Sequence, residues 1–283
     1  MKILFILILN LLVLPTHATV KLKPKKFVRK LKRNKESLFF SKRKYRKSRL
    51  FNKHFSRLEE IGINLNSKGR CRYFTRRSLL KANNQNDWDC FFAFRGLIRD
   101  TRRCLPSFED LNNSKDSTKA VKGRIRYVGV APLPYRYRIE KIGEKFILKM
   151  KVAYKNWNKL SMKAQKRLRN RFNKGVQFWN DHSPEQYRFD IKLVQKSENP
   201  DFVVNAVNKS TRGPYLREHS TYWPSLTFAH EFGHMMGLDD EYDQIFATLF
   251  RNRRCTSKSL MCSSRNKFFP DYYWYLIFRR FAC

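Results

Sequence analysis

The chain has 283 residues, and its 61 Lys and Arg against 23 Asp and Glu give a formal net charge of +38. Hydrophobic residues make up 42% of it, with 24 Phe and 13 Tyr, which is enough for a packed core and excludes wholesale disorder. The length allows one large domain or two modest ones, and the excess positive charge would attract polyanions.

The N-terminal end has the pattern of a secretory signal peptide over residues 1–18. One Lys precedes an apolar run from Ile3 to Leu14, and Thr16 and Ala18 are the small residues of a cleavage site after Ala18. The alternative is an uncleaved membrane anchor, but the run is short for spanning a bilayer. No later segment is apolar enough to span one, so we expect a secreted or periplasmic protein that is not an integral membrane protein.

Residues 19–60 form a basic N-terminal extension, a polybasic leader or propeptide with Lys or Arg at nearly every other position. We expect most of it to be solvated and disordered, although interspersed apolar residues allow an amphipathic basic helix. The sharper alternatives are a propeptide, or an anchor for an anionic surface or polymer whose binding weakens with salt. Basic charge is spread along the chain and not concentrated on one helix that could contact bases in a groove, so no specific nucleic-acid module is predicted.

Six cysteines follow the signal peptide, three early and three late. They are Cys71, Cys90, Cys104, Cys255, Cys262 and Cys283. An even number in an exported chain favours up to three disulfides, and complete pairing requires at least one link between the two groups. We expect a cysteine-containing subdomain and linker over residues 61–117, followed by a more regular pattern of strands and helices. The polar stretch 107–119 is interpreted as a linker or long loop.

Residues 118–283 carry the regular patterns of an α+β (mixed α/β) domain. Residues 145–154 alternate apolar and polar side chains like a half-buried strand. Ser161 is a suitable N-cap for a helix whose apolar residues recur from Ala164 to Trp179. Further elements are expected as strands over 187–195, 201–208 and 215–223, a helix around His230, and an aromatic C-terminal helix within 268–281. This order predicts a twisted sheet packed on two long helices.

The stretch Thr227–Asp243, TFAHEFGHMMGLDDEYD, holds two histidines and five acids but no Lys or Arg. His230 and His234 are four residues apart, so a helix brings both to one face, where they can bind one zinc ion. Glu231 follows the first ligand and can act as general base on a zinc-activated water without binding the metal itself. The lack of positive side chains fits a pocket that holds a dication.

A glycine and an aspartate complete the pattern. Gly237 can adopt the left-handed conformation that ends a helix and turns the chain back. Asp240, three residues further on, is then close enough to supply a third ligand. Asp239 and Glu241 flank it, and either could take its place. A ligand from a second helix is disfavoured, because few carboxylates follow Asp243.

The segment HEFGHMMGLDD, residues 230–240, resembles the metzincin zinc-protease signature H-E-x-x-H-x-x-G-x-x-H/D, with Asp in the last place. The aspartate version is similar to that of small secreted bacterial members such as snapalysin. The resemblance covers residues 118–283 and implies a metzincin-like zincin catalytic domain. It also implies that the strand before the zinc helix, Tyr215–Trp223, pairs with extended substrate.

The resemblance further implies a role for each residue of the site. Zinc would be bound by His230, His234 and Asp240, with Glu231 as the general base and Met261 in a downstream "Met-turn" beneath the metal. The implied function is a secreted zinc-dependent endopeptidase that acts on proteins or peptides. The alternative is an exported polybasic protein that binds anionic surfaces or polymers and uses a metalloprotease-like domain as a scaffold.

Two hypotheses concern the cysteines near such a site. Cys255 and Cys262 bracket the Met-turn and are hypothesised to form a short disulfide that fixes it. Matrixins, one metzincin branch, keep a free propeptide cysteine on the zinc, and Cys71 or Cys104 could act in this way. Disulfide pairing of both is favoured by the even cysteine count.

Overall fold

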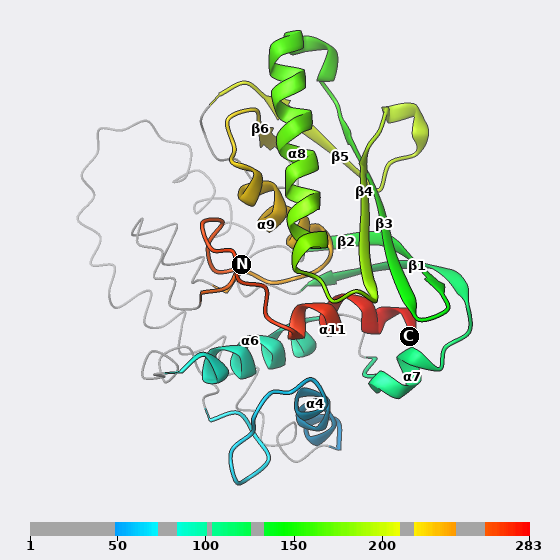
Figure 1. Ribbon diagram of the computed structural model, residues 1–283, viewed down its shortest axis with the longest axis vertical. Helices are drawn as coiled ribbons and strands as arrows, with labels where there is room; N and C mark the ends of the chain where they lie inside the picture. The colour runs from blue at the N-terminus through cyan, green and yellow to red at the C-terminus, as the bar shows by residue number, and fades with distance from the viewer. Residues whose placement is uncertain (1–48, 73–83, 101–103, 126–132, 210–217, 242–257) are drawn as a thin grey trace, which may run out of the picture. The chain divides into compact units, whose positions relative to one another are not determined.

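Helices pack around a mixed sheet in the computed structural model of the chain (Figure 1). The structure describes residues 49–72, 84–100, 104–125, 133–209, 218–241 and 258–283. The predicted signal peptide and most of the predicted leader therefore lie outside the described residues. All described residues belong to one compact unit, Phe40–Cys283. No described helix has the length and apolar character needed to cross a membrane.

The first half of the sheet is antiparallel. It consists of β1 (Ser117–Ile125), β2 (Leu133–Ile142) and β3 (Lys145–Tyr154), paired in that order. A tight turn at Gly143, with φ of +57°, joins β2 to β3, and this left-handed conformation favours glycine. The strand predicted over 145–154 is confirmed as β3. The sequence did not single out β1 and β2 as strands.

The second half of the sheet is parallel. β4 (Tyr187–Leu193) and β5 (Phe202–Val207) both pair with β3, and β6 (Glu218–Ser220) pairs with β5. The strands predicted over 187–195 and 201–208 are confirmed with shorter ends. Of the strand predicted over 215–223, residues 218–220 form β6, residues 221–223 are not strand, and the rest lies outside the described residues. The mixed α/β class is thereby confirmed.

The long helix α8 (Met162–His182) packs on β4 and on the histidine helix α9 (Ser225–Met235). As predicted, the Ser161 side chain caps α8 by accepting a hydrogen bond from the Ala164 amide. A Cβ at Gly175 would lie 2.7 Å from the Phe228 Cβ, so glycine is what lets the two helices approach this closely. Both helices are thus held against the sheet as expected.

In the described part of the chain before the sheet there are three helices: α4 (Arg49–Glu60), α6 (Gln85–Arg99) and α7 (Phe108–Asn112). The prediction of a linker or long loop over 107–119 was wrong, since α7 and the start of β1 occupy it. Ser107 and Asp110 form a reciprocal capping box that starts α7, a local signal that polarity alone does not reveal.

Helix α6 joins the hydrophobic core and packs against the C-terminal helix α11 (Tyr272–Phe278). All seven residues of α11 are buried, which agrees with the expected aromatic core helix. This helix is shorter than predicted and continues as a 3-10 turn, η3 (Arg279–Phe281). Helix α4 packs on α6 and buries Phe55 and Leu58, so the last part of the predicted leader contributes to the core.

Two disulfides lie within the described residues, Cys71–Cys90 and Cys104–Cys283. The second confirms the expected link between the early and late cysteines, and it ties the segment after α6 to the C-terminus. Because Cys71 and Cys104 are both bonded, neither is a free thiol, and the hypothesis of a zinc-binding latency cysteine at these positions was wrong. Cys262 is disulfide-bonded, but Cys255 lies outside the described residues, so their predicted pairing stays a prediction.

Candidate metal centre

Helix α9 carries the two predicted histidine ligands and ends just after them. The amide of Gly237 donates to the His234 carbonyl and the amide of Leu238 to the Gly233 carbonyl, which closes the helix. Gly237 has φ of +85°, the left-handed conformation that the sequence predicted for this glycine. The chain then turns back toward the histidines.

This turn brings Asp240 to both imidazoles. The Asp240 Oδ1 atom lies 3.2 Å from His230 Nε2 and 3.1 Å from His234 Nε2. We call Asp240, His230 and His234 the histidine cluster. All three are buried, with exposed fractions of 2%, 1% and 4% in that order. Residues ten positions apart thus meet at one point, as the predicted ligand set requires.

Hydrogen bonds fix which nitrogen each imidazole turns toward Asp240. His230 Nδ1 lies 2.8 Å from the Leu260 carbonyl oxygen, and His234 Nδ1 lies 3.0 Å from that of Leu238. A carbonyl can only accept, so each Nδ1 carries hydrogen and donates it. In the neutral imidazole the lone pair is then on Nε2, the form in which histidine binds a metal.

The geometry of the histidine cluster fits a zinc ion. Two nitrogen lone pairs and a carboxylate oxygen face one another, an arrangement of acceptors that only a cation or added protons can stabilise. Zinc bonds of 2.0–2.1 Å in a tetrahedron place neighbouring ligand atoms about 3.3 Å apart. The separations of the Asp240 Oδ1 atom from both imidazole Nε2 atoms match this spacing.

The electrostatics of the cluster point the same way. Burial alone would raise the pKa of Asp240, but the two imidazoles hold it well below the usual aspartate value. Burial alone would lower the pKa of His234, yet the charges of Asp240 and Glu231 raise it to about 9. The field at the histidine nitrogens therefore favours positive charge.

Glu231 lies beside the cluster and is only 4% exposed. One of its carboxylate oxygens lies within 4.8 Å of ligand atoms of His230 and His234. Asp240 Oδ1 lies at the spacing of tetrahedral zinc ligands from both imidazoles, so Asp240 suits the place of third ligand and leaves another role beside the histidines to Glu231. This is the arrangement in which a carboxylate can take a proton from a water held there.

Asp239, the first neighbour of Asp240, binds two arginines of α6. Its Oδ2 accepts hydrogen bonds from Arg95 Nε at 2.7 Å and from Arg99, both on α6. Burial would raise the pKa of Asp239, but the two guanidinium groups lower it overall. Arg95 also donates to the Asp240 carbonyl oxygen, so α6 holds the backbone of the turn that presents Asp240.

Glu241, the second neighbour, also points away from the imidazoles. Its carboxylate accepts hydrogen bonds from the hydroxyls of Ser259, Tyr272 and Tyr273. Its amide donates to the Met261 carbonyl at 3.0 Å. Glu241 therefore joins the turn after Asp240 to the turn around Met261, and of the three adjacent acids only Asp240 faces the histidines.

Met261 is buried against the histidine helix. A Cβ at Gly233 would lie 2.4 Å from the Met261 Sδ atom, so the thioether occupies the space that a side chain at Gly233 would need. The preceding residue, Leu260, accepts the hydrogen bond from His230. The turn that carries Met261 thus packs against α9 and accepts the hydrogen bond that orients His230.

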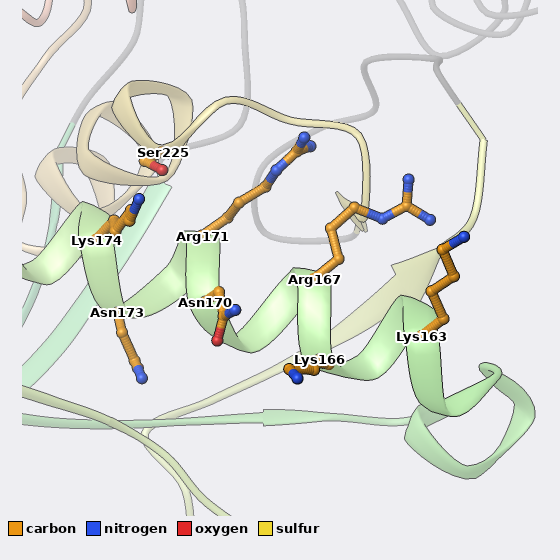
Figure 2. Close-up of a pocket in the computed structure, with 8 residues that line it drawn as sticks. All are labelled: Lys163, Lys166, Arg167, Asn170, Arg171, Asn173, Lys174 and Ser225. Carbon is orange, nitrogen blue, oxygen red and sulfur yellow. The ribbon is translucent and has the colours of Figure 1, made fainter.

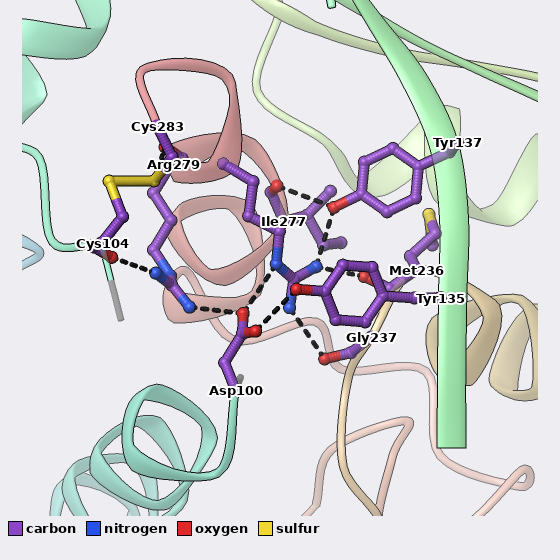
Figure 3. Close-up of polar contacts among 10 residues, drawn as sticks. Asp100, Cys104, Tyr135, Tyr137, Met236, Gly237, Ile277, Arg279 and Cys283 are labelled. Atoms are coloured by element: carbon purple, nitrogen blue, oxygen red, sulfur yellow. Dashed lines mark hydrogen bonds and ion pairs between the residues drawn. A yellow bond between two sulfur atoms is a disulfide. The ribbon is translucent and has the colours of Figure 1, made fainter. Parts of the chain in front are cut away.

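A second buried cluster holds the end of α9 (Figure 3). Arg280 donates to the carbonyls of Met236 and Gly237 and to Asp100 Oδ2 at 2.8 Å. Arg279 donates to the same Asp100 oxygen at 2.7 Å and to the carbonyl of Cys104.

Two tyrosines complete this second cluster. The hydroxyl of Tyr135 donates to Asp100 Oδ1 at 2.6 Å, and that of Tyr137 accepts from Arg280 at 2.7 Å. We call these residues the arginine cluster: Asp100, Tyr135, Tyr137, Arg279 and Arg280. It fixes the C-terminal end of the histidine helix through main-chain carbonyls.

The arginines correct one expectation. The stretch Thr227–Asp243 lacks positive residues, but the fold brings Arg95, Arg99 and Arg280 to its turn from elsewhere. They bind Asp239 and backbone carbonyls while Asp240 faces the imidazoles, so the positive charges are neutralised away from the metal position. No local signal in the sequence reveals these partners; only the link between early and late cysteines hinted at their proximity.

Comparisons with protein-family models, with curated proteins and with solved structures find no match. The interpretation of the site therefore rests on its own residues and geometry.

Proposed function

We propose that this protein is an exported zinc-dependent endopeptidase of metzincin type. The observation that supports this most strongly is the convergence of His230, His234 and Asp240, with both imidazoles fixed through Nδ1 and Glu231 on the same helical turn. The disulfides support export, since such bonds persist in oxidising compartments.

Each residue would have one task in peptide hydrolysis. His230, His234 and Asp240 would hold the zinc ion, which when bound lowers the pKa of a water and polarises the scissile carbonyl. Glu231 would accept the proton of the attacking water and pass it to the leaving amine. Met261, Glu241 and the arginine cluster would act by positioning the helix and its turn.

Strand β6 is the candidate for binding substrate backbone. Within the described residues it pairs with β5 on one side only. An extended peptide could add to its other edge through main-chain hydrogen bonds. This edge leads directly into α9, so a peptide bound there would run toward the histidines.

The buried state of the site bears on how the activity should be tested. Glu231 and the histidine cluster are each at most 4% exposed, so a polypeptide reaches them only after neighbouring residues move. We therefore expect low activity from the full chain, and cleavage that keeps α4, whose Phe55 and Leu58 belong to the core, tests whether the residues before α4 limit access.

The test is hydrolysis of an unfolded protein substrate by the chain and by Glu231→Ala, with the zinc content of each measured. We expect zinc in both and activity in the wild type alone, with a loss of about 100-fold or more in the variant. The assay is repeated after limited proteolysis that removes leader residues. Equal activity of the two proteins, or full activity without metal, would refute the proposal.

A further inference from the structure

Helix α8 presents a strongly basic face next to the start of α9 (Figure 2). It borders a recess of about 590 Å³ whose charged lining residues are all cations: Lys163, Lys166, Arg167, Arg171 and Lys174. We call these five residues the basic face. Figure 2 shows them along successive turns of one helix, with Ser225 of α9 at one end of the recess.

Part of the basic face is held in place by the protein. Arg171 donates hydrogen bonds to the carbonyls of Thr221 and Trp223, at 2.9 and 3.1 Å. The guanidinium of Arg167 lies 4.6 Å from the centre of the Tyr222 ring. Two of the charges are thus fixed against the chain that leads into α9, whereas the three lysines are exposed.

The charges of the basic face are not balanced within the part of the chain that the structure describes. Some other surface lysines there do have a carboxylate partner, as in Lys149–Glu140 and Lys192–Asp190. Among the described residues, no carboxylate forms an ion pair with the basic face. Like charges three and four residues apart destabilise a helix by a few tenths of a kcal/mol per pair. An external anion would remove this repulsion.

The shape of the basic face fits an extended polymer better than a single small anion. From Lys163 to Lys174 the helix rises about 16 Å at 1.5 Å per residue. The amides of Asn170 and Asn173 line the same recess and can exchange hydrogen bonds with hydroxyl groups. Alternating anionic groups and hydroxyls are what a sulfated polysaccharide offers.

Two other polyanions fit less well. Single-stranded nucleic acid binds through aromatic rings on which bases stack, and the exposed ring at this site, Tyr222, has Arg167 over it. A membrane-surface helix inserts its apolar face, but α8 buries Leu168, Phe172 and Trp179 in the core and leaves Met162 as its one exposed large apolar side chain.

We propose that the basic face of α8 binds a sulfated polysaccharide, with sulfate groups at the five cations and sugar hydroxyls at Asn170 and Asn173. The site would be used outside the cell and would retain the protein on a sulfated matrix. It is separate from the histidine cluster and does not depend on the proposed peptidase activity.

The test compares two charge-matched triple variants of the full chain, with a heparin oligosaccharide as the probe. Each replaces three exposed lysines by Gln, which has a similar helix propensity, so both should fold. The basic-face variant is Lys163→Gln, Lys166→Gln and Lys174→Gln. The control is Lys122→Gln, Lys145→Gln and Lys267→Gln, at exposed positions outside α8.

We expect the basic-face variant to bind heparin about tenfold more weakly than wild type near 0.15 M NaCl, with a shallower dependence of log K on log salt. The control should change by less than about twofold. Equal weakening in both variants would mean diffuse attraction, including attraction by the leader, and would overturn the proposal. Tighter and equally lysine-dependent binding of a single-stranded oligonucleotide of matched charge, or of anionic vesicles, would overturn it as well.

Discussion

The two buried polar clusters on either side of the Gly237–Glu241 turn differ in how their charges are balanced. In the arginine cluster, two guanidinium groups share one carboxylate, and further donors reach carbonyls and a tyrosine hydroxyl. In the histidine cluster, the Nε2 atoms of two imidazoles and a carboxylate oxygen point at one another. The first is held by hydrogen bonds within the chain, whereas the acceptors of the second are stabilised only by protons on the imidazoles or by a bound cation.

The contrast distinguishes a structural network from a binding site. Buried charges that are paired and hydrogen-bonded hold a fold in place, and removing one partner is strongly destabilising. Buried acceptors that face one another gain stability only when a cation arrives, and metal binding then adds to folding free energy. The structural cluster is what lets the binding cluster keep its geometry.

The largest expected effect is on the arginine cluster. Asp100→Ala removes the carboxylate shared by Arg279 and Arg280, leaving two buried cations without it, and should cost about 3–5 kcal/mol of unfolding free energy. Urea denaturation measures this. The matched control is Asp190→Ala, the partner of the exposed Lys192, which should change stability by less than about 1 kcal/mol. If both variants lost equally little unfolding free energy, the arginine cluster would not be a network on which the fold depends.

The adjacent aspartates should separate metal binding from structure. Asp240→Asn should weaken zinc binding by more than about 100-fold, since it removes a ligand. Asp239→Asn should chiefly lower the unfolding free energy, because Arg95 and Arg99 lose their buried charge partner. Zinc affinity is measured by competition with a chelating dye and stability by urea. Equal losses of zinc affinity would contradict the assignment of Asp240 as the ligand.

A smaller effect on stability is expected where Met261 packs against Gly233 of α9. Gly233→Ala places a methyl group against the Met261 thioether and should cost about 1–3 kcal/mol by overpacking. In a Met261→Ala background the same substitution should cost less, because the obstructing side chain is gone. Thermal or urea unfolding of the four proteins completes the cycle. An unchanged cost would mean that Met261 does not limit the space at Gly233.

The last effect concerns pH. Burial, opposed by a hydrogen bond from Gln85 and assisted by the charge of Glu241, raises the pKa of Asp89 to about 7. The folded chain thus keeps a proton that the unfolded chain loses near pH 4, so this residue makes stability fall from about pH 4 to about pH 7. Asp89→Asn should flatten that slope and be more stable than wild type above pH 7.

The control for this pH effect is Asp181→Asn, at an exposed position near the end of α8. It should keep the wild-type dependence of unfolding free energy on pH. A wild-type slope in Asp89→Asn would show that other groups carry the pH dependence.

The approach of the site residues to one another could be predicted because their spacing is local. His230, His234 and Gly237 lie within one helix and its end, so the helical repeat and the left-handed glycine are enough to place them. The spacing also favoured Asp240 over its two acidic neighbours. It did not reveal what holds Asp239 in place, because Arg95 is 144 residues from Asp239 in sequence.

The same reasoning explains what the sequence predicted of the fold. Strand β3 and helix α8 have clear periods, and their bounds were close to those expected. Helix α6 has polar and apolar residues mixed on its buried faces, because its arginines are paired inside the protein. A pattern of apolar spacing does not reveal a helix whose buried side includes paired charges.

The most direct test of the account is the metal content of the native protein, expressed with zinc in the medium and purified without chelators. The account predicts one zinc ion per chain in the wild type and in the exposed-histidine control His182→Ala. It predicts loss of zinc from His230→Ala and from His234→Ala. A wild-type chain without bound metal, or variants that keep as much zinc as the control, would contradict the account.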